Sequence, residues 1–394
     1  MADPTTKASA ALPAAARSAS SRAMELVASA VALAALLYVF LVAIALFGTA
    51  FKLLGSGFSE SLIRTTSHPV VGLMIGLLST SLIQSSSGTT SIVVGMVAGG
   101  ALTVRGAIPI MMGANLGTTI TNTLVAMASL NRRAEFQRAF AGATMHDFFN
   151  LLAILVLFPL ELSTRYLERS ATWLSQHLVG SGGAEFPNPV KDATMPAVHG
   201  LQDLLAGPLG LTERATAIAM FAIGLVALFF ALAFLTRLLK QLFLSRAEGA
   251  LTDRLRGGDA VAMLAGLVIT VAVQSSSITT SLLVPLIGAG IIPMGPAFAA
   301  TLGANVGTCV TALLASLAGT PAALTVALVH LLFNLTGIAL FYPIPAVRRI
   351  PIRLATALAR QTARRRVFAV YYIAGVFFVM PLLFVLVDKL LFSH

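Results

Sequence analysis

A polar motif that occurs twice constrains this chain more than any other feature of its sequence. The run Gln84–Ser91 reads QSSSGTTS, and it returns 190 residues later as QSSSITTS at Gln274–Ser281. A second run, GANLGTT at Gly113–Thr119, returns after the same interval as GANVGTC at Gly303–Cys309. Both pairs of polar clusters stand in strongly apolar sequence. A duplicated chain with matched polar clusters at membrane depth is typical of a transporter with two half-sites.

The composition places the chain in a lipid bilayer. Hydrophobic residues make up 57% of the sequence and charged residues 10%, whereas soluble domains carry about 25% charged residues. We therefore predict an all-α, polytopic membrane protein. The stretches long enough to span the membrane are 26–51, 107–130, 139–160, 215–245, 296–318, 321–345 and 367–391.

Two shorter apolar stretches lead directly into the Gln-Ser motifs. They cover residues 69–83 and 259–273, and a spanning helix needs about 20 residues. Each stretch therefore predicts a re-entrant or broken helical hairpin, over about 68–100 in the first copy and 259–291 in the second. Non-helical backbone at this depth is tolerated where protein buries it or where it lines a cavity.

Basic residues indicate that the second copy is inverted relative to the first. The net charge is +11, and we assign most Lys and Arg side chains to cytoplasmic loops rather than to nucleic-acid binding. Arg105, Arg165, Arg169 and Lys191 are expected outside and are the exceptions. Copy one carries Arg132, Arg133 and Arg138 after its GAN segment, whereas 318–322 in copy two carry none. In the segments that precede the hairpins, copy two is instead the more basic, because residues 246–256 contain three arginines. This exchange predicts inverted-topology repeats.

The expected organisation follows from this topology. The N-terminus is cytoplasmic, the C-terminus extracytoplasmic, and the single cysteine, Cys309, excludes an intramolecular disulfide. The expected segments are a disordered cytoplasmic tail (1–23), repeat one (24–161), an extracytoplasmic linker (162–213), inverted repeat two (214–345), a basic cytoplasmic segment (346–366) and a final transmembrane helix (367–394).

The polar clusters suit the binding of an anion together with Na⁺. Broken helices expose N–H groups that favour anions at one end, while hydroxyl and carbonyl oxygens suit a hard cation. The alternative is tight helix packing, with each hydroxyl bonded to its own helix, and the glycines are open to the same interpretation. The repeated spacing favours the binding interpretation. The candidate residues are Gln84, Ser85, Ser86, Ser87, Thr89, Asn115, Thr118, Gln274, Ser275, Ser276, Ser277, Thr279, Asn305 and Thr308.

The titratable residues argue against an enzyme. The cores of the hairpins lack Lys, Arg, Asp and Glu, and no metal-ligand cluster or nucleotide-binding motif is visible, so we expect no cofactor other than a coupling ion. His146 and His330 each precede an Asn by four residues, which indicates either interhelical hydrogen bonds or ion or proton work. For Asp147 two interpretations stay open. Either it makes ion binding differ between the two repeats, or it pairs with Arg138 or another cation at the cytoplasmic end.

At these motifs the sequence resembles a known family, the type II sodium–phosphate cotransporters of bacteria and animals. The resemblance rests on the two Gln-Ser runs, on Leu102–Thr118, on the segment Arg138–Asp147, and on the second GAN and His-Asn motifs. It covers roughly 26–161 and 215–385.

The resemblance implies inward symport of inorganic phosphate with Na⁺ by alternating access in the cell membrane, with both Gln-Ser motifs in the binding site. A Na⁺-coupled carrier of another small oxyanion or carboxylate, and an anion channel, stay open. So does association into a homo-oligomer.

Overall fold

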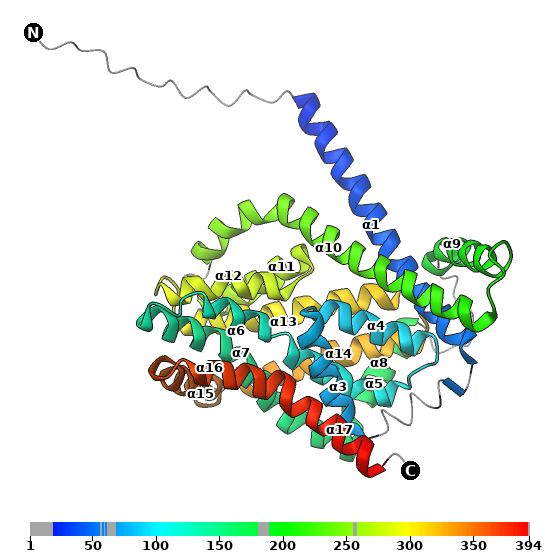
Figure 1. Cartoon of the computed structure of the whole chain (residues 1–394). Helices are drawn as coiled ribbons and strands as arrows, with labels where there is room; N and C mark the ends of the chain where they lie inside the picture. The colour runs from blue at the N-terminus through cyan, green and yellow to red at the C-terminus, as the bar shows by residue number, and fades with distance from the viewer. Residues whose placement is uncertain are drawn as a thin grey trace, which may run out of the picture.

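The computed structural model describes residues 19–55, 57–58, 60, 68–179, 189–254 and 258–392, and within them the chain is helical with no strand. This confirms the predicted all-α fold (Figure 1). Most of the predicted tail, residues 1–18, lies outside the described residues, and the first helix begins at Ala19. The helices are α1 (Ala19–Leu53), α3 (Pro69–Ile83), α4 (Ser86–Ala98), α5 (Val104–Gly117), α6 (Ile120–Met127), α7 (Arg133–Thr164), α8 (Tyr166–Val179), α9 (Pro189–Ala206), α10 (Glu213–Arg254), α11 (Asp259–Val273), α12 (Ser276–Gly288), α13 (Met294–Ser316), α14 (Pro321–Phe341), α15 (Pro345–Arg364), α16 (Val367–Ala374), the π-helical turn η1 (Gly375–Val379) and α17 (Met380–Phe392).

Six helical segments of the described chain are long and apolar enough to cross a membrane. They are Met24–Leu53, Arg133–Thr164, Glu213–Leu242, Met294–Ser316, Pro321–Phe341 and Val367–Leu390. The chain is therefore a multi-pass membrane protein, as predicted. The helix expected over 107–130 is missing from this set.

That helix is interrupted, so the prediction of one continuous span over 107–130 was wrong. The hydroxyl of Thr119 donates to the carbonyl oxygen of Leu116 at 2.8 Å, where α5 ends. Such local hydroxyl bonds compete with the helical ladder. The matching residue in the second copy is Cys309, whose Sγ makes only a 3.5 Å contact with the Asn305 carbonyl, and α13 continues through this point to Ser316.

Both predicted broken hairpins are present. The arms of the first are α3 and α4, and those of the second are α11 and α12. Each arm has 13 or 15 residues. At 1.5 Å per residue an arm reaches about 20 Å, which is less than the ~30 Å hydrocarbon core of a bilayer.

Glycines hold the first arm of each hairpin against the following helix. A β-carbon on Gly76 of α3 would overlap the carbonyl oxygen of Ile110 in α5, and one on Gly266 of α11 would overlap that of Ala300 in α13. The two contacts are related by the same 190-residue interval as the motifs. Gly113 makes an equally close contact with the backbone of Leu73, and its counterpart Gly303 makes the same contact with Met263. The glycines of the GAN segments therefore serve close backbone packing, and the two copies share one packing scheme.

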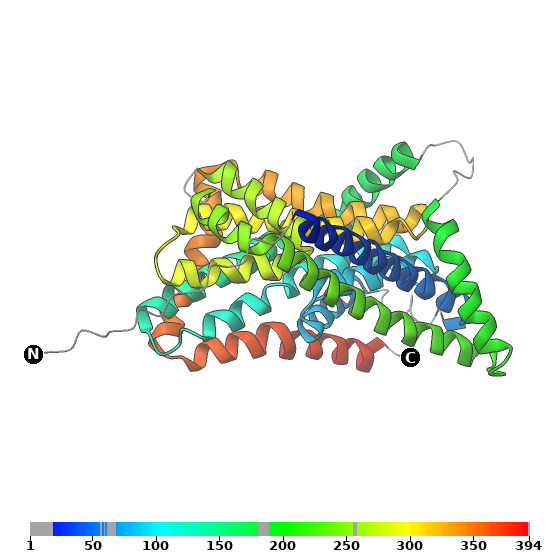
Figure 2. The same ribbon diagram turned by 90° about the horizontal axis from the view of Figure 1, so that it is seen from above.

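Two segments for which no secondary structure was predicted are also helical. The linker region 162–213 contains α8 and α9, and the basic segment 346–366 is largely α15. In both views α15 lies at one end of the bundle, while the C-terminal end of α17 extends toward the other (Figures 1 and 2). Phe149 of α7 and Phe298 of α13 are fully buried between the repeats, with ring centroids 5.9 Å apart.

The glycine contacts predict a sharp contrast in stability. Gly76→Ala and Gly266→Ala should each destabilise the protein by about 1–3 kcal/mol or more, because backbone atoms must move apart. Gly200→Ala in α9, where a β-carbon meets nothing within 4 Å, should be neutral or stabilising by up to about 1 kcal/mol. Thermal unfolding of the purified protein in detergent measures the difference. Equal melting temperatures for the three variants would refute the packing argument.

Candidate transport site

Each Gln-Ser motif is the break between the two arms of a hairpin. Gln84 adopts a left-handed conformation (φ 55°, ψ 28°) at the end of α3, and Gln274 adopts the same one (φ 55°, ψ 27°) at the end of α11. This conformation costs about 1–2 kcal/mol for a residue other than glycine. A strained backbone repeated at matched positions indicates a functional constraint.

The first serine of each motif caps the arm that follows. The Ser85 hydroxyl accepts from the Gly88 N–H at 3.1 Å, and the Ser275 hydroxyl accepts from the Ile278 N–H at 3.4 Å. These are N-cap hydrogen bonds. Within the described residues, no hydrogen bond involves the hydroxyls of Ser86 or Ser276, which occupy the first turns of α4 and α12 and are buried. The first serine of each motif is therefore a cap, whereas the hydroxyl of the second is not engaged by any described residue.

The two breaks touch each other. The hydroxyl of Ser87 lies 3.5 Å from the backbone oxygen of Gln274 and 3.5 Å from the hydroxyl of Thr311. Thr311 in turn donates to the side-chain oxygen of Gln274 at 3.0 Å. The structure thus brings together two turns that are 190 residues apart in the sequence. Thr311 was not among the predicted site residues.

The two halves differ in how their hydroxyl groups are bonded. In repeat two, Thr270 donates to Thr279 at 2.8 Å, and Gln274 is 7% exposed. In repeat one, the matching Gln84 is exposed. Three buried hydroxyls of this repeat have no hydrogen-bond partner among the described residues, namely those of Thr80, Ser91 and Thr121. The matching hydroxyls of repeat two, those of Thr270, Ser281 and Thr311, all have hydrogen-bond partners.

Asn122, also absent from the prediction, links the repeats at a second place. Its side-chain oxygen accepts from the hydroxyl of Thr280 at 2.8 Å and from that of Ser281 at 3.3 Å. Its counterpart in repeat two is Ala312. The sequence signal for this contact was an asparagine within an apolar helix, because a buried amide needs hydrogen-bond partners.

The asparagines of the GAN segments bond to the histidine helices of the opposite repeat. His146 of repeat one lies 2.6 Å from the side-chain oxygen of Asn305 of repeat two. Reciprocally, His330 of repeat two lies 3.2 Å from that of Asn115 of repeat one. All four side chains are at most 3% exposed. This reciprocity is what a local twofold relation produces.

Two further asparagines close this network. Asn115 donates to Asn334 at 2.9 Å and to Asn150 at 3.2 Å, and Asn305 donates to Asn150 at 3.2 Å. The structure therefore supports interhelical hydrogen bonding as the role of His146 and His330. Among the described residues, the side chains of Asn115 and Asn305 bond to this network rather than to the Gln-Ser turns.

The predicted threonines turn their hydroxyls toward their own helices. Thr118 and Thr308 donate to the carbonyl oxygens of Ala114 and Ala304, each at 3.1 Å. Thr89 donates to Ser85 O at 3.1 Å. Thr279 lies 3.4 Å from Ser275 O and also accepts from Thr270. Ser277 is partly exposed on α12.

Asp147 pairs with a residue that the sequence did not indicate. Tyr372 of α16 donates to its Oδ2 at 2.6 Å. The suggested pairing with Arg138 was wrong, because nine residues of helix place the two side chains on opposite faces of α7. Arg138 instead donates to the carbonyl oxygen of Gly288 at 2.7 Å.

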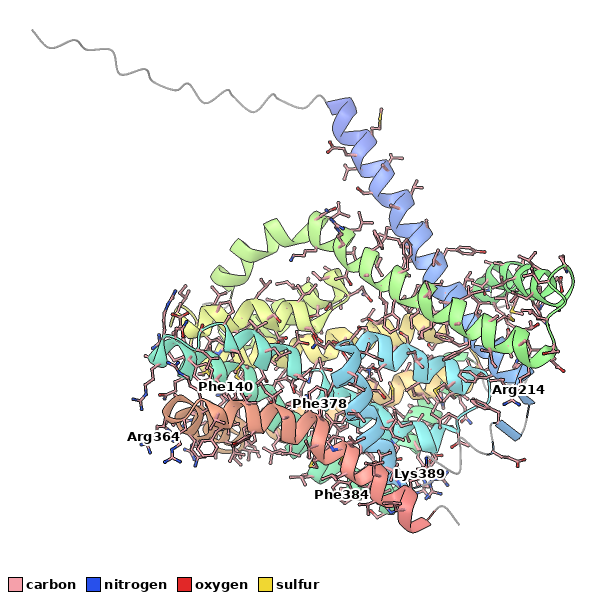
Figure 3. All side chains as sticks on the ribbon, in the orientation of Figure 1. Phe140, Arg214, Arg364, Phe378, Phe384 and Lys389 are labelled. Carbon is pink, nitrogen blue, oxygen red and sulfur yellow. The ribbon has the colours of Figure 1, made fainter. Side chains whose placement is uncertain are left out.

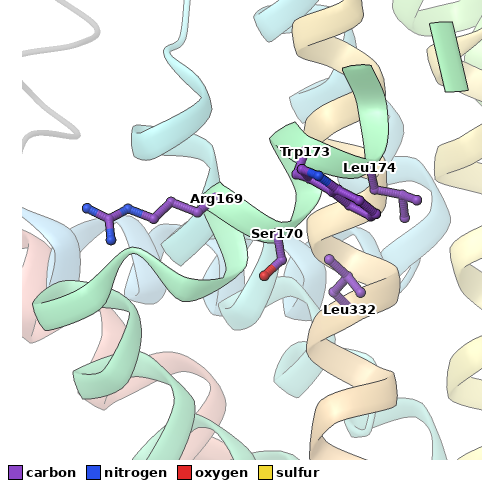
Figure 4. A pocket seen from close by; sticks show the side chains of 5 residues that line it. All are labelled: Arg169, Ser170, Trp173, Leu174 and Leu332. Atoms are coloured by element: carbon purple, nitrogen blue, oxygen red, sulfur yellow. The ribbon is translucent and has the colours of Figure 1, made fainter. Parts of the chain in front are cut away.

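A groove of about 450 Å³ lies elsewhere, on the outer side of α8 and α14. Arg169, Ser170, Trp173, Leu174 and Leu332 line it (Figure 4). No residue of the predicted site contributes to this groove. It is therefore separate from the two Gln-Ser turns.

Fold and site together define a helical membrane protein built by internal duplication, with two broken hairpins that meet. The sequence matches the model of the Na⁺/Pi-cotransporter family over residues 39–174 and 227–358, and the chain belongs to this family. The two matched segments fall on the two repeats and leave out most of the α8–α10 connection.

Curated relatives agree with this assignment. The sodium-dependent phosphate transport protein 2A of Mus musculus is 36% identical, over 88% of this chain and 66% of that protein. The 2A protein of Rattus norvegicus is 35% identical, over 88% of this chain and 65% of that protein. The 2B protein of Homo sapiens is 34% identical, over 88% of this chain and 63% of that protein. The chain thus spans just under two thirds of the length of these relatives. No solved structure matches it.

The reciprocal network predicts a stability effect of its own. Asn115→Ala should destabilise the protein by at least about 1–3 kcal/mol, because it removes the side-chain partner of the buried His330 ring nitrogen and of the buried Asn334 side-chain oxygen. Thr118→Val removes a hydroxyl that bonds only to its own helix and should cost less than about 1 kcal/mol. Thermal unfolding in detergent compares the two. A smaller effect for Asn115→Ala than for Thr118→Val would show that the network does not join the repeats.

Proposed function

We propose that this protein is a secondary active transporter that carries inorganic phosphate into the cell together with Na⁺, by alternating access. One observation carries the proposal: the two Gln-Ser turns meet, with Ser87 against Gln274. The names of the curated relatives, sodium-dependent phosphate transport proteins, support the choice of substrate and coupling ion. The site is one pocket divided between two repeats.

Phosphate binds at the N-termini of α4 and α12. Both helices begin at the second serine of a motif, Ser86 and Ser276. The N–H groups of the first two residues of each helix have no intrahelical acceptor, whereas the third is capped by Ser85 or Ser275. The helix dipole favours negative charge at these ends. The hydroxyls of Ser86 and Ser276, to which no described residue is bonded, complete the set of donors.

Na⁺ binds through hydroxyl and carbonyl oxygens of the same clusters and offsets the charge of phosphate. The unpaired hydroxyls of Thr80, Ser91 and Thr121 support oxygen coordination on the side of repeat one. Asp147 adds a carboxylate to repeat one, whereas Leu331 occupies the matching place in repeat two. The two halves therefore contribute unequally to ion binding.

The repeats are inverted, with a cytoplasmic N-terminus and an extracytoplasmic C-terminus in the cell membrane. Contacts at the two ends of the GAN helices support the inversion. The α13–α14 turn at Gly319 lies beside Ala98, at the end of the first hairpin. The α6–α7 region lies beside the end of the second hairpin, where Arg138 holds Gly288. The segment α5–α6 and its counterpart α13 therefore run in opposite directions.

Uptake by the purified protein in proteoliposomes tests the function. With an imposed inward Na⁺ gradient, the wild type should concentrate phosphate. Ser86→Ala and Ser276→Ala should each lower the rate at least about tenfold, since a hydrogen bond to a charged group contributes about 1.5–3 kcal/mol. Ser163→Ala is the matched control, because this exposed hydroxyl bonds only to its own helix. Wild-type uptake by both motif variants would refute the site.

The same vesicles separate the competing functions. A channel would equilibrate phosphate without concentrating it, and replacement of Na⁺ by K⁺ would leave its rate unchanged. A carrier of another oxyanion or carboxylate would accumulate that solute in preference to phosphate. Accumulation that follows a proton gradient alone would contradict Na⁺ coupling.

Single cysteines test the inverted topology. Cys309 is buried, and its replacement by serine gives a background free of cysteine. In intact cells, a membrane-impermeant maleimide should label Arg105→Cys and Arg214→Cys, whereas Arg133→Cys and Arg360→Cys should react only after permeabilisation. Labelling of Arg105→Cys and Arg133→Cys from the same side would contradict the inversion.

A further inference from the structure

The helix α15 is held flat against one end of the bundle. It has 20 residues, a length of about 30 Å, and short connections join it to the spanning segments at both ends. The candidate span before it ends at Phe341, and the one after it begins at Val367. α15 is in contact with α7, and it lies at the same end of the bundle in both views (Figures 1 and 2). A helix tied in this way between two spans lies parallel to the membrane surface.

One face of α15 is fixed to the protein. Pro351, Ala355 and Ala359 are buried on this face. Arg348 extends it with an ion pair to Asp259 of α11 at 2.7 Å, and its guanidinium lies 5.0 Å from the centre of the Tyr342 ring. These contacts set the rotation of the helix about its axis, and therefore decide which side chains face outward.

The outward face carries a stripe of four arginines, namely Arg349, Arg353, Arg360 and Arg364, all exposed. At about 100° per residue they fall within an arc of about 60°. The helix contains no acidic residue, and none of the four forms an ion pair among the described residues. Arg364 lies at the outer edge of the bundle in Figure 3. The stripe is thus an uncompensated row of positive charge.

Apolar side chains lie next to this stripe. Ile350 and Leu354 are each 39% exposed, and both follow a stripe arginine directly in the sequence. A basic row beside an apolar row, on a helix parallel to the bilayer, matches the boundary between lipid headgroups and acyl chains. A soluble polyanion would use the charges but leave Ile350 and Leu354 in water.

We propose that the outward face of α15 is a binding site for anionic phospholipid headgroups, with the arginine stripe on the phosphates and Ile350 and Leu354 at the acyl chains. Each basic side chain near an anionic lipid surface contributes about 1 kcal/mol. The proposal depends neither on the transported substrate nor on which leaflet faces α15. Positive charge in short loops sets topology, but it does not require four arginines to align on one face.

Native mass spectrometry of the purified full chain in detergent tests the proposal. Bound lipid is counted after addition of phosphatidylglycerol or phosphatidylcholine. The wild type should prefer phosphatidylglycerol, and replacement of the four stripe arginines by glutamine should reduce this preference at least tenfold. Replacement by lysine, which keeps the charge, should retain most of it. The double variant Arg353→Gln/Arg360→Gln should give an intermediate loss, and it serves if the fourfold glutamine variant does not fold.

A control with the same change of charge isolates the stripe. Arg105, Arg169, Arg214 and Arg237 are exposed and without an ion pair among the described residues, and their joint replacement by glutamine should leave the preference unchanged. An equal loss in this control, or a wild-type preference in the glutamine variants, would overturn the proposal. So would equal binding of both lipids by the wild type, the result expected if α15 instead docks a soluble acidic partner.

Discussion

The backbone at a helix break inside an apolar bundle must find hydrogen-bond partners, and the rest of this structure depends on that constraint. An unsatisfied N–H or C=O costs several kcal/mol in a medium without water. The Gln-Ser turn meets the constraint locally. Gln84 and Gln274 end the first arm in a left-handed conformation, and Ser85 and Ser275 cap the second arm. The first serine caps the new helix, and the hydroxyl of the next serine has no hydrogen bond among the described residues.

Duplication places two such turns in one molecule, and we propose that they form one shared site. Glycines lock each hairpin to its GAN helix through backbone contact, so each repeat is a stiff unit. The repeats are then joined by polar contacts of two kinds. The histidine–asparagine network exchanges identical bonds in both directions, whereas the contacts at the turns are unequal. Under the alternating access that we propose, the two units move relative to each other, and an exchange of the bonding of the two turns gives a second state of similar energy.

Much of the fold followed from the sequence because its signals are local or repeated. The hairpins were predictable since 15 apolar residues before a polar cluster are too few to cross a bilayer. The role of Gly113 and Gly303 was left open between ligand binding and close helix packing, because only the neighbouring helix decides between the two. The break after α5 was not predictable: Thr118 and Thr119 both bond back to carbonyl groups, yet Thr308 does so inside a continuous helix. Tyr372 escaped prediction because it lies 225 residues from Asp147 and has no counterpart in the repeat.

The central claim is that two turns form one divided site, and the stoichiometry of phosphate binding tests it most directly. Equilibrium binding of labelled phosphate to the purified protein in saturating Na⁺ should give one phosphate per chain. Either Ser86→Ala or Ser276→Ala alone should remove most of that binding, because each half needs the other. Two phosphates per chain in the wild type, or half of the binding retained by each single variant, would show two independent sites and contradict the account.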